Sequence, residues 1–121
     1  MSKILIVDDD VTITDLMKSL VQMEGHTPAI VNDSLQAVEV ARAVGPDLIT
    51  LDLMMPGLNG FELCEILHND PMFADVPIII ISAKDDHESK QKALAVGAMD
   101  YITKPFDVDE FLEKVKIFVT N

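Results

Sequence analysis

Three short runs of the chain are apolar nearly throughout: Ile4–Val7, Leu48–Leu51 and Ile78–Ile81. A strand with one face in water would alternate apolar and polar residues, whereas a parallel strand covered on both faces is continuously apolar. We therefore predict three buried parallel strands. Two weaker candidates, Pro28–Val31 and Met99–Ile102, bring the expected number of strands to five.

Helical periodicity fills the segments between these strands. Apolar residues recur at i, i+3, i+4 and i+7 from Ile13 to Leu20, and Gly25 is placed to end that helix. The same spacing returns after Val108, and further helices are expected over about 34–44, 60–69 and 86–96. This alternation predicts an α/β fold: a flavodoxin-like, doubly wound five-stranded parallel sheet in the order 2-1-3-4-5, with five helices.

Length, charge and cysteine content narrow the class of protein. The 121 residues, 49% of them hydrophobic, are expected to form one folded domain over residues 1–121. A net charge of −12 repels nucleic acid and anionic membranes, so neither is expected as a direct partner. The one cysteine, Cys64, excludes an internal disulfide and is interpreted as a small buried residue. The first apolar run is too short for a signal peptide or a membrane span, so we expect a cytoplasmic protein.

Polar residues follow four of the predicted strands: Asp8–Asp10, Asp52, Ser82, and Thr103 with Lys104. In open α/β sheets ligands bind beyond the carboxyl ends of the strands, so these side chains are expected to converge at one edge. An aspartate after a strand often only caps the next helix, and Asp10 is interpreted in that way. The remaining set is too large for the same explanation.

Clustered carboxylates repel one another, and a bound cation relieves that repulsion. The three histidines, His26, His68 and His87, are scattered without ligand spacing, so the predicted donors are all oxygen, which favours Mg²⁺. A carboxylate can attack phosphorus and form an aspartyl phosphate, a reaction that requires mainly positioning and charge neutralisation. The metal and the Lys104 ammonium would supply positive charge, and the Ser82 hydroxyl would supply a hydrogen bond.

Four blocks of the sequence resemble response regulator receiver domains of two-component systems: Ile4–Asp9, Asp52–Gly60, Ile80–Ala83 and Gly97–Phe106. They occur in the order and spacing of that family, and the resemblance covers essentially the whole chain. It implies that Asp52 is the phosphoacceptor and receives its phosphoryl group from the phosphohistidine of a sensor histidine kinase or a histidine phosphotransfer protein. The only catalysis implied is phosphorylation and hydrolysis at its own aspartate, so the chain is not expected to be an enzyme in the usual sense.

The resemblance also assigns ligands and phosphoryl contacts. Asp9 and Asp52 would bind Mg²⁺ directly, together with the backbone carbonyl of Met54, and Asp8 would act mostly through water. Ser82 and Lys104 would hold the phosphoryl oxygens.

Further expectations from the resemblance concern the switch and the output. The Lys104–Pro105 bond would be cis, which a proline peptide bond allows at low cost. Ser82 and Tyr101 would move together and change the face formed by the fourth helix, fifth strand and fifth helix, where an effector protein or domain would bind. A homodimer on phosphorylation is a further expectation. Tyr101 could equally be a half-buried strand residue without a switching role. Family members vary at the positions of Met54 and Lys84, so the phosphoryl lifetime is not readable from the sequence.

Three alternatives remain open at this point. A Mg²⁺-dependent aspartyl-phosphate phosphatase usually carries a second aspartate where Met54 stands, and a flavodoxin-like electron carrier would need a phosphate-binding loop where Asp8–Asp10 stand. A degenerate receiver would act only as a protein-binding module, although all expected residues are present. Whether residues 1–121 form a complete regulator or part of a longer protein is also open, as are the cognate kinase and the oligomeric state.

Overall fold

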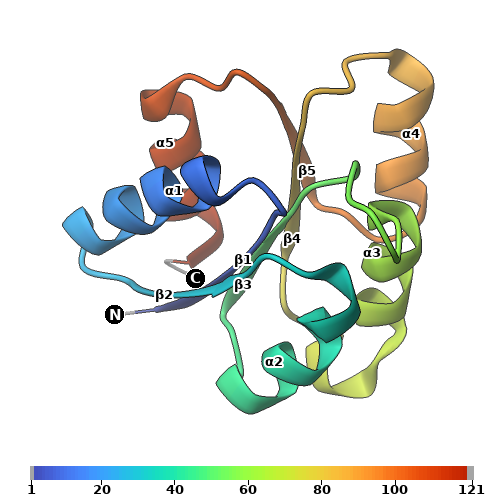
Figure 1. Cartoon of the computed structure of the whole chain (residues 1–121), viewed down its shortest axis with the longest axis horizontal. Helices are drawn as coiled ribbons and strands as arrows, with labels where there is room; N and C mark the ends of the chain where they lie inside the picture. Colours follow the sequence, from blue (N-terminus) through green and yellow to red (C-terminus); the bar gives the residue numbers. More distant parts are fainter. Residues whose placement is uncertain (1, 120–121) are drawn as a thin grey trace.

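A single parallel sheet organises the computed structural model, which describes residues 2–119 (Figure 1). Its strands are β1 (Lys3–Val7), β2 (Thr27–Val31), β3 (Leu48–Leu51), β4 (Ile78–Ser82) and β5 (Asp100–Thr103). They pair in the order β2-β1-β3-β4-β5, and every neighbouring pair is parallel. The predicted fold class and strand order are therefore confirmed, and the predicted strand ends agree with the observed ones to within one residue.

Helices cover both faces of this sheet. Figure 1 shows α1 (Val11–Met23) and α5 (Val108–Val119) on one face, and α2 (Ala37–Val44), α3 (Gly60–Asn69) and α4 (His87–Ala95) on the other. Two 3-10 turns, η1 (Ser34–Gln36) and η2 (Pro71–Phe73), complete the described elements. Within residues 2–119, no helix has both the length and the hydrophobicity that a membrane span requires.

The core consists of two apolar layers, one on each side of the sheet. Leu48 packs with α1 and α5, whereas its neighbours Ile49 and Leu51 pack with α2, α3 and α4. All four residues of β3 are buried, as expected for a central parallel strand covered on both faces. Cys64 of α3 is fully buried in the apolar layer between this helix and the sheet, which confirms its interpretation as a core residue.

One predicted helix begins differently in the structure. The segment expected to be helical over residues 34–44 starts with the 3-10 turn η1 and becomes α-helical only at Ala37. The Asp33 carboxylate accepts a hydrogen bond from the backbone N–H of Leu35, and the buried Ser34 hydroxyl is bonded to a distant loop. These contacts favour a tight first turn over a regular α-helical one.

Candidate metal and phosphoacceptor site

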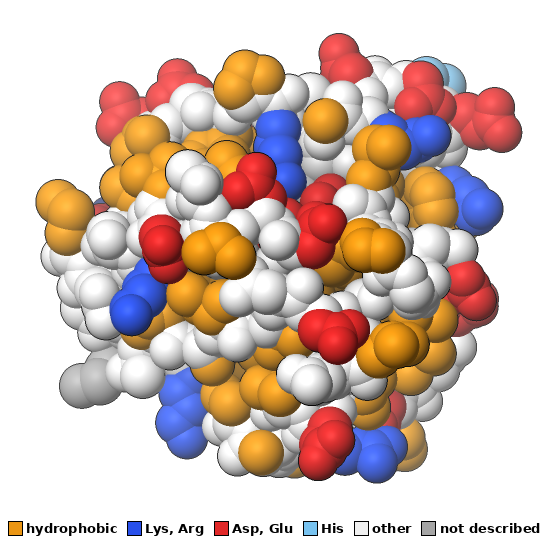
Figure 2. All heavy atoms as spheres, in the orientation of Figure 1, with side chains coloured by type: hydrophobic (Ala, Val, Ile, Leu, Met, Phe, Trp, Pro, Cys, Tyr) orange, Lys and Arg blue, Asp and Glu red, His pale blue; other side chains and the backbone are white. Residues whose placement is uncertain are grey.

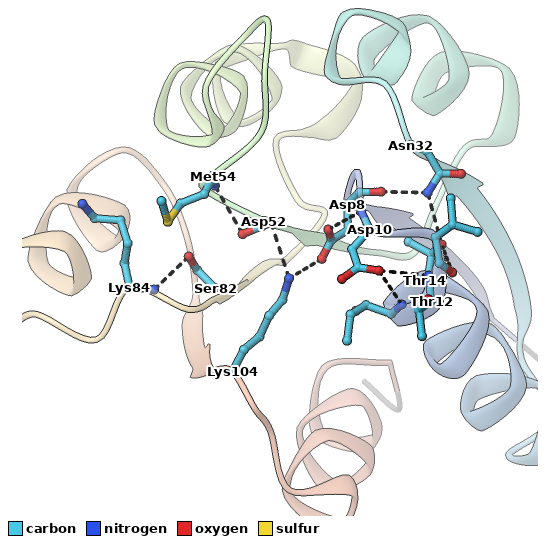
Figure 3. Close-up of polar contacts among 12 residues, drawn as sticks. Asp8, Asp10, Thr12, Thr14, Asn32, Asp52, Met54, Ser82, Lys84 and Lys104 are labelled. Atoms are coloured by element: carbon cyan, nitrogen blue, oxygen red, sulfur yellow. Dashed lines mark hydrogen bonds and ion pairs between the residues drawn. The ribbon is translucent and has the colours of Figure 1, made fainter.

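Side chains of the residues that directly follow β1, β3 and β5 meet at the carboxyl edge of the sheet (Figure 3). Lys104 follows β5, and its Nζ lies 2.5 Å from Asp8 Oδ2 and 3.4 Å from Asp52 Oδ2. Asp8 and Asp52 are both buried, whereas Asp9 is exposed. The convergence predicted from the ends of the strands is therefore observed for these residues.

Asp8, Asp9 and Asp52 could hold a metal ion. Each offers one carboxylate oxygen, and these oxygens all lie within 4.8 Å of one another. Oxygen donors at this spacing suit a small hard cation, and the exposed Asp9 leaves the site accessible from solvent. None of the three histidines belongs to this acidic cluster, which is the one group of potential metal ligands found within residues 2–119.

The electrostatics of the site favour bound positive charge. Burial raises the pKa of Asp52, and the neighbouring Asp8 carboxylate raises it further, whereas Lys104 and the N–H of Met54 act in the opposite direction; the net pKa is raised. Burial lowers the pKa of Lys104, but its hydrogen bond to Asp8 and the charge of Asp52 outweigh burial, so that its net pKa is also raised. The carboxylates thus hold Lys104 charged, while one ammonium group does not restore Asp52 to its ordinary pKa.

The loop from β1 into α1 is shaped by its own aspartates. Asp10 is the N-cap of α1, and its carboxylate accepts from the N–H groups of Thr12 and Ile13, which confirms its predicted capping role. Asp8 Oδ1 accepts from the Asp10 N–H at 3.0 Å, which turns the chain sharply after β1. The turn leaves the other Asp8 oxygen directed at Lys104.

The loop from β3 into α3 packs closely against the backbone of Asp52. Asp52 Oδ1 accepts from the Met54 N–H at 3.3 Å, and the N–H of Gly60 donates to the Leu53 carbonyl at 3.1 Å. A Cβ atom on Gly60 would lie 2.4 Å from the Asp52 carbonyl oxygen. Only glycine therefore permits this approach, so that the start of α3 lies directly against the end of β3.

The ends of β4 and β5 are linked through the backbone of Lys84. Ser82 Oγ accepts from the Lys84 N–H at 3.3 Å, and the Tyr101 hydroxyl donates to the Lys84 carbonyl at 2.6 Å. Thr103, which the strand pattern placed at the same edge, donates instead to Asp85 outside the acidic cluster. Thr103 pairs with Ser82 at the end of β5 and so lies at the predicted edge, but its hydroxyl bonds to Asp85 and not to the carboxylates of the acidic cluster. The Lys104–Pro105 peptide bond is cis.

Two residues that contact the site, Asn32 and Ser34, were not predicted from the sequence. Asn32 Nδ2 donates to the Asp8 carbonyl at 2.8 Å, and Ser34 Oγ is bonded to the loop after Asp52. A signal was available, because both follow β2, and β2 is a parallel strand whose carboxyl end lies at the same edge as those of β1 and β3.

Comparisons with known proteins agree with this fold and site. Residues 4–116 match the response regulator receiver domain family. The DNA-binding dual master transcriptional regulator RpaA of Synechocystis is 40% identical over 116 residues, which are 96% of this chain and 48% of the relative. The phosphate regulon transcriptional regulatory protein PhoB of Pseudomonas aeruginosa is 41% identical over 113 residues, which are 93% and 49% of the two chains. The chain thus spans about half the length of the curated relatives it matches.

Solved structures give the same result. The chemotaxis protein CheY4 of Vibrio cholerae superposes with a TM-score of 0.92 at 28% identity, and the match covers 98% of each chain. The BeF3-activated N-terminal receiver domain of Klebsiella pneumoniae RstA gives a TM-score of 0.92 at 27% identity, covering 98% of this chain and 99% of that one. A doubly wound sheet with an acidic cluster and a lysine at its carboxyl edge is thus a receiver-type signalling module. The chain belongs to the response regulator receiver domain family of two-component systems.

Proposed function

We propose that this receiver takes a phosphoryl group onto Asp52 from a phosphohistidine donor, with Mg²⁺ bound beside the acceptor. One observation carries the proposal: a buried carboxylate with a raised pKa lies 3.4 Å from an ammonium group and within 4.8 Å of two further carboxylates. A carboxylate in such a place is poorly solvated and therefore a competent nucleophile once cations compensate the charge around it.

Each residue of the site has a separate role in the proposed phosphoryl transfer. An Asp52 oxygen forms the new bond to phosphorus while the phosphorus–nitrogen bond of the donor breaks. The electron pair of that bond stays on the nitrogen, and the donor ring, protonated on its other nitrogen, leaves as neutral imidazole. Asp8, Asp9 and Asp52, with the Met54 carbonyl, would hold Mg²⁺, which when bound neutralises charge on the phosphoryl oxygens. Lys104 supplies a second positive charge, and the Ser82 hydroxyl is placed on the neighbouring strand to donate a hydrogen bond.

The backbone of Lys84 would transmit the structural change from the phosphorylated site to Tyr101. Its N–H is bonded to Ser82 and its carbonyl to Tyr101, so a hydroxyl that turns toward the phosphoryl group releases one of the two contacts. We propose that this change shifts Tyr101 and the surface formed by α4, β5 and α5, which an effector protein or domain, or a second copy of the chain, would then recognise.

The proposal also covers the phosphodonor, the extent of the domain and the cellular compartment. The donor is a sensor histidine kinase or a histidine phosphotransfer protein, and the only catalysis is phosphorylation and hydrolysis of the chain's own aspartate. We propose that residues 1–121 form one receiver domain that works in the cytoplasm, a reducing compartment suited to the free thiol of Cys64. Figure 2 shows acidic side chains spread across the face in view, which is consistent with no direct binding to nucleic acid or membrane.

The test is intact-mass measurement after incubation with Mg²⁺ and a small-molecule phosphodonor. The wild type is expected to gain the mass of one phosphoryl group, and Asp52→Asn is expected to gain none. Asp15→Asn, an exposed aspartate of α1, is the matched control and should be labelled like the wild type. An unlabelled wild type would support the degenerate-receiver alternative, and equal labelling of Asp52→Asn would show that another residue is the acceptor.

A further inference from the structure

Two polar residues of the loop after β2 contact both loops that form the acidic site. Asn32 Nδ2 donates to the backbone carbonyl of Asp8 at 2.8 Å and to Thr14 Oγ1 at 3.1 Å (Figure 3). The first contact holds the end of β1, where the carboxylates begin, and the second holds the first turns of α1. The β1–α1 loop is therefore attached to Asn32 at both of its ends.

Ser34 makes the corresponding contacts with the loop after Asp52. Its side-chain oxygen donates to the Pro56 carbonyl at 2.9 Å and accepts from the Leu58 N–H at 3.1 Å. Ser34 is only 2% exposed, and a Cβ atom on Gly57 would lie 3.1 Å from its Oγ. One hydroxyl thus uses both its donor and an acceptor lone pair to hold the middle of a loop more than twenty residues away.

We infer that Asn32 and Ser34 are positioning residues for metal binding at the acidic site. The inference rests on the proposed function. The proposed metal ligands come from two loops after two different strands, and a segment of three residues, 32–34, is bonded to both loops. Mg²⁺ requires near-ideal octahedral geometry, so the relative placement of the Asp8–Asp9 carboxylates and the Met54 carbonyl decides its affinity. Loss of either contact would leave all ligands present but less well placed.

The experiment compares Ser34→Ala with Ser89→Ala. Ser89→Ala is the matched control, because it also removes a buried, hydrogen-bonded hydroxyl. Ser89 is 6% exposed, and its hydroxyl donates to Asp86 at the start of α4, away from the acidic loops. Mg²⁺ affinity is measured by isothermal titration calorimetry, and amide hydrogen exchange is measured by NMR on the metal-free protein. Ser34→Ala is expected to bind Mg²⁺ about tenfold more weakly, as for other residues that orient metal ligands. The Leu58 amide should exchange faster even without metal.

Two further variants separate positioning from loss of folding. Ser34→Thr keeps the hydroxyl and is expected to restore most of the Mg²⁺ affinity. Asn32→Ala, a change at an exposed residue, removes the other contact and is also expected to weaken Mg²⁺ binding while the melting temperature stays near that of Ser89→Ala. If Ser34→Ala does not fold, the affinity of Asn32→Ala and Ser34→Thr decides the result.

The outcomes are distinguishable. Wild-type protein that binds no Mg²⁺ would contradict the proposed function itself. Wild-type protein that binds Mg²⁺, with Ser34→Ala and Asn32→Ala equal to Ser89→Ala in affinity, would overturn the positioning role and leave the proposed function intact. A uniform rise in exchange throughout the protein, rather than at Leu58 and its loop, would also overturn it.

Discussion

The ammonium group of Lys104 compensates two buried carboxylates, so replacing it with methionine tests the electrostatic basis of the site directly. Methionine keeps an unbranched apolar side chain of similar length and removes the charge. Lys104 Nζ lies 2.5 Å from Asp8 and 3.4 Å from Asp52, whose side chains are only 3% and 7% exposed. Because both carboxylates are buried, the variant leaves them without the ammonium group that compensates their charge.

The expected loss is large in the absence of metal. Removing one partner of a buried ion pair costs about 3–5 kcal/mol, and the lower end applies because the Lys104 side chain is 16% exposed. A loss of about 3 kcal/mol corresponds to a fall in melting temperature of roughly 12 °C for a domain of this size. Magnesium should reduce this deficit, because in the variant the cation no longer competes with an ammonium group for the same carboxylates. Metal at a hundredfold excess over the Kd of a given protein raises the free energy of unfolding of that protein by about 2.7 kcal/mol.

The assay is urea unfolding followed by far-UV circular dichroism, because the chain contains no tryptophan to follow by fluorescence. Lys104→Met and wild type are compared in EDTA and in millimolar magnesium, with the exposed Lys18→Met as the control for removal of a lysine. Lys104→Met should be less stable in EDTA, closer to wild type in magnesium, and bind Mg²⁺ more tightly than wild type. A variant as stable as wild type in EDTA, or one whose deficit magnesium leaves unchanged, would refute the reasoning.

Three further predictions concern buried groups outside the charge cluster. Thr50→Val should raise the free energy of unfolding by about 1 kcal/mol, because the Thr50 hydroxyl is buried without a hydrogen-bond partner within residues 2–119; Thr14→Val, which deletes a bonded hydroxyl, should lower it. Gly60→Ala should destabilise the protein by about 3 kcal/mol in chemical denaturation, because its Cβ would overlap the Asp52 carbonyl; an unchanged midpoint would show that the loop can move aside. Burial, with a smaller contribution from Glu65, raises the pKa of Cys64 to about 11. The unfolded thiol ionises first, so stability should fall as the pH rises from about 8.5 toward that value, less steeply in Cys64→Ala.

Hydrophobic patterning was sufficient for the sheet because its central strands are buried on both faces. Ile4–Val7, Leu48–Leu51 and Ile78–Ile81 have no solvent-facing positions that would interrupt the apolar runs, and topology then brings their carboxyl ends together. Asp8 and Asp52 follow adjacent strands and could be predicted as neighbours for that reason alone, because short right-handed connections determine the strand order. Lys104 follows the edge strand β5, so the strand pattern predicted only that it lies at the same edge, and its contacts with Asp8 and Asp52 come from the structure.

Contacts that depend on the direction of a side chain could not be predicted from the sequence. The 3-10 turn at Ser34 and the hydrogen bond from Tyr101 to the Lys84 carbonyl depend on which way a hydroxyl points and on what a distant loop offers it. Local propensity contains neither piece of information, because both contacts join residues that are far apart in the chain. Thr103 illustrates the same limit, since adjacent residues of one strand end reach different partners.

The electrostatic and positional parts of the site depend on each other. Lys104 lies closer to Asp8 than to Asp52, so its ammonium group is shared unequally between the two carboxylates, and burial together with the Asp8 charge keeps the pKa of Asp52 raised. A phosphoryl group on Asp52 would add negative charge at that same point, so the demand for cations would rise when the group is transferred. In the proposed site, meeting that demand would require the carboxylates and the Met54 carbonyl to stay in place while the charge changes. The hydrogen bonds from Asn32 to the Asp8 carbonyl and from Ser34 to the Pro56 carbonyl suit this requirement, because phosphorylation does not alter the charge of these two backbone groups.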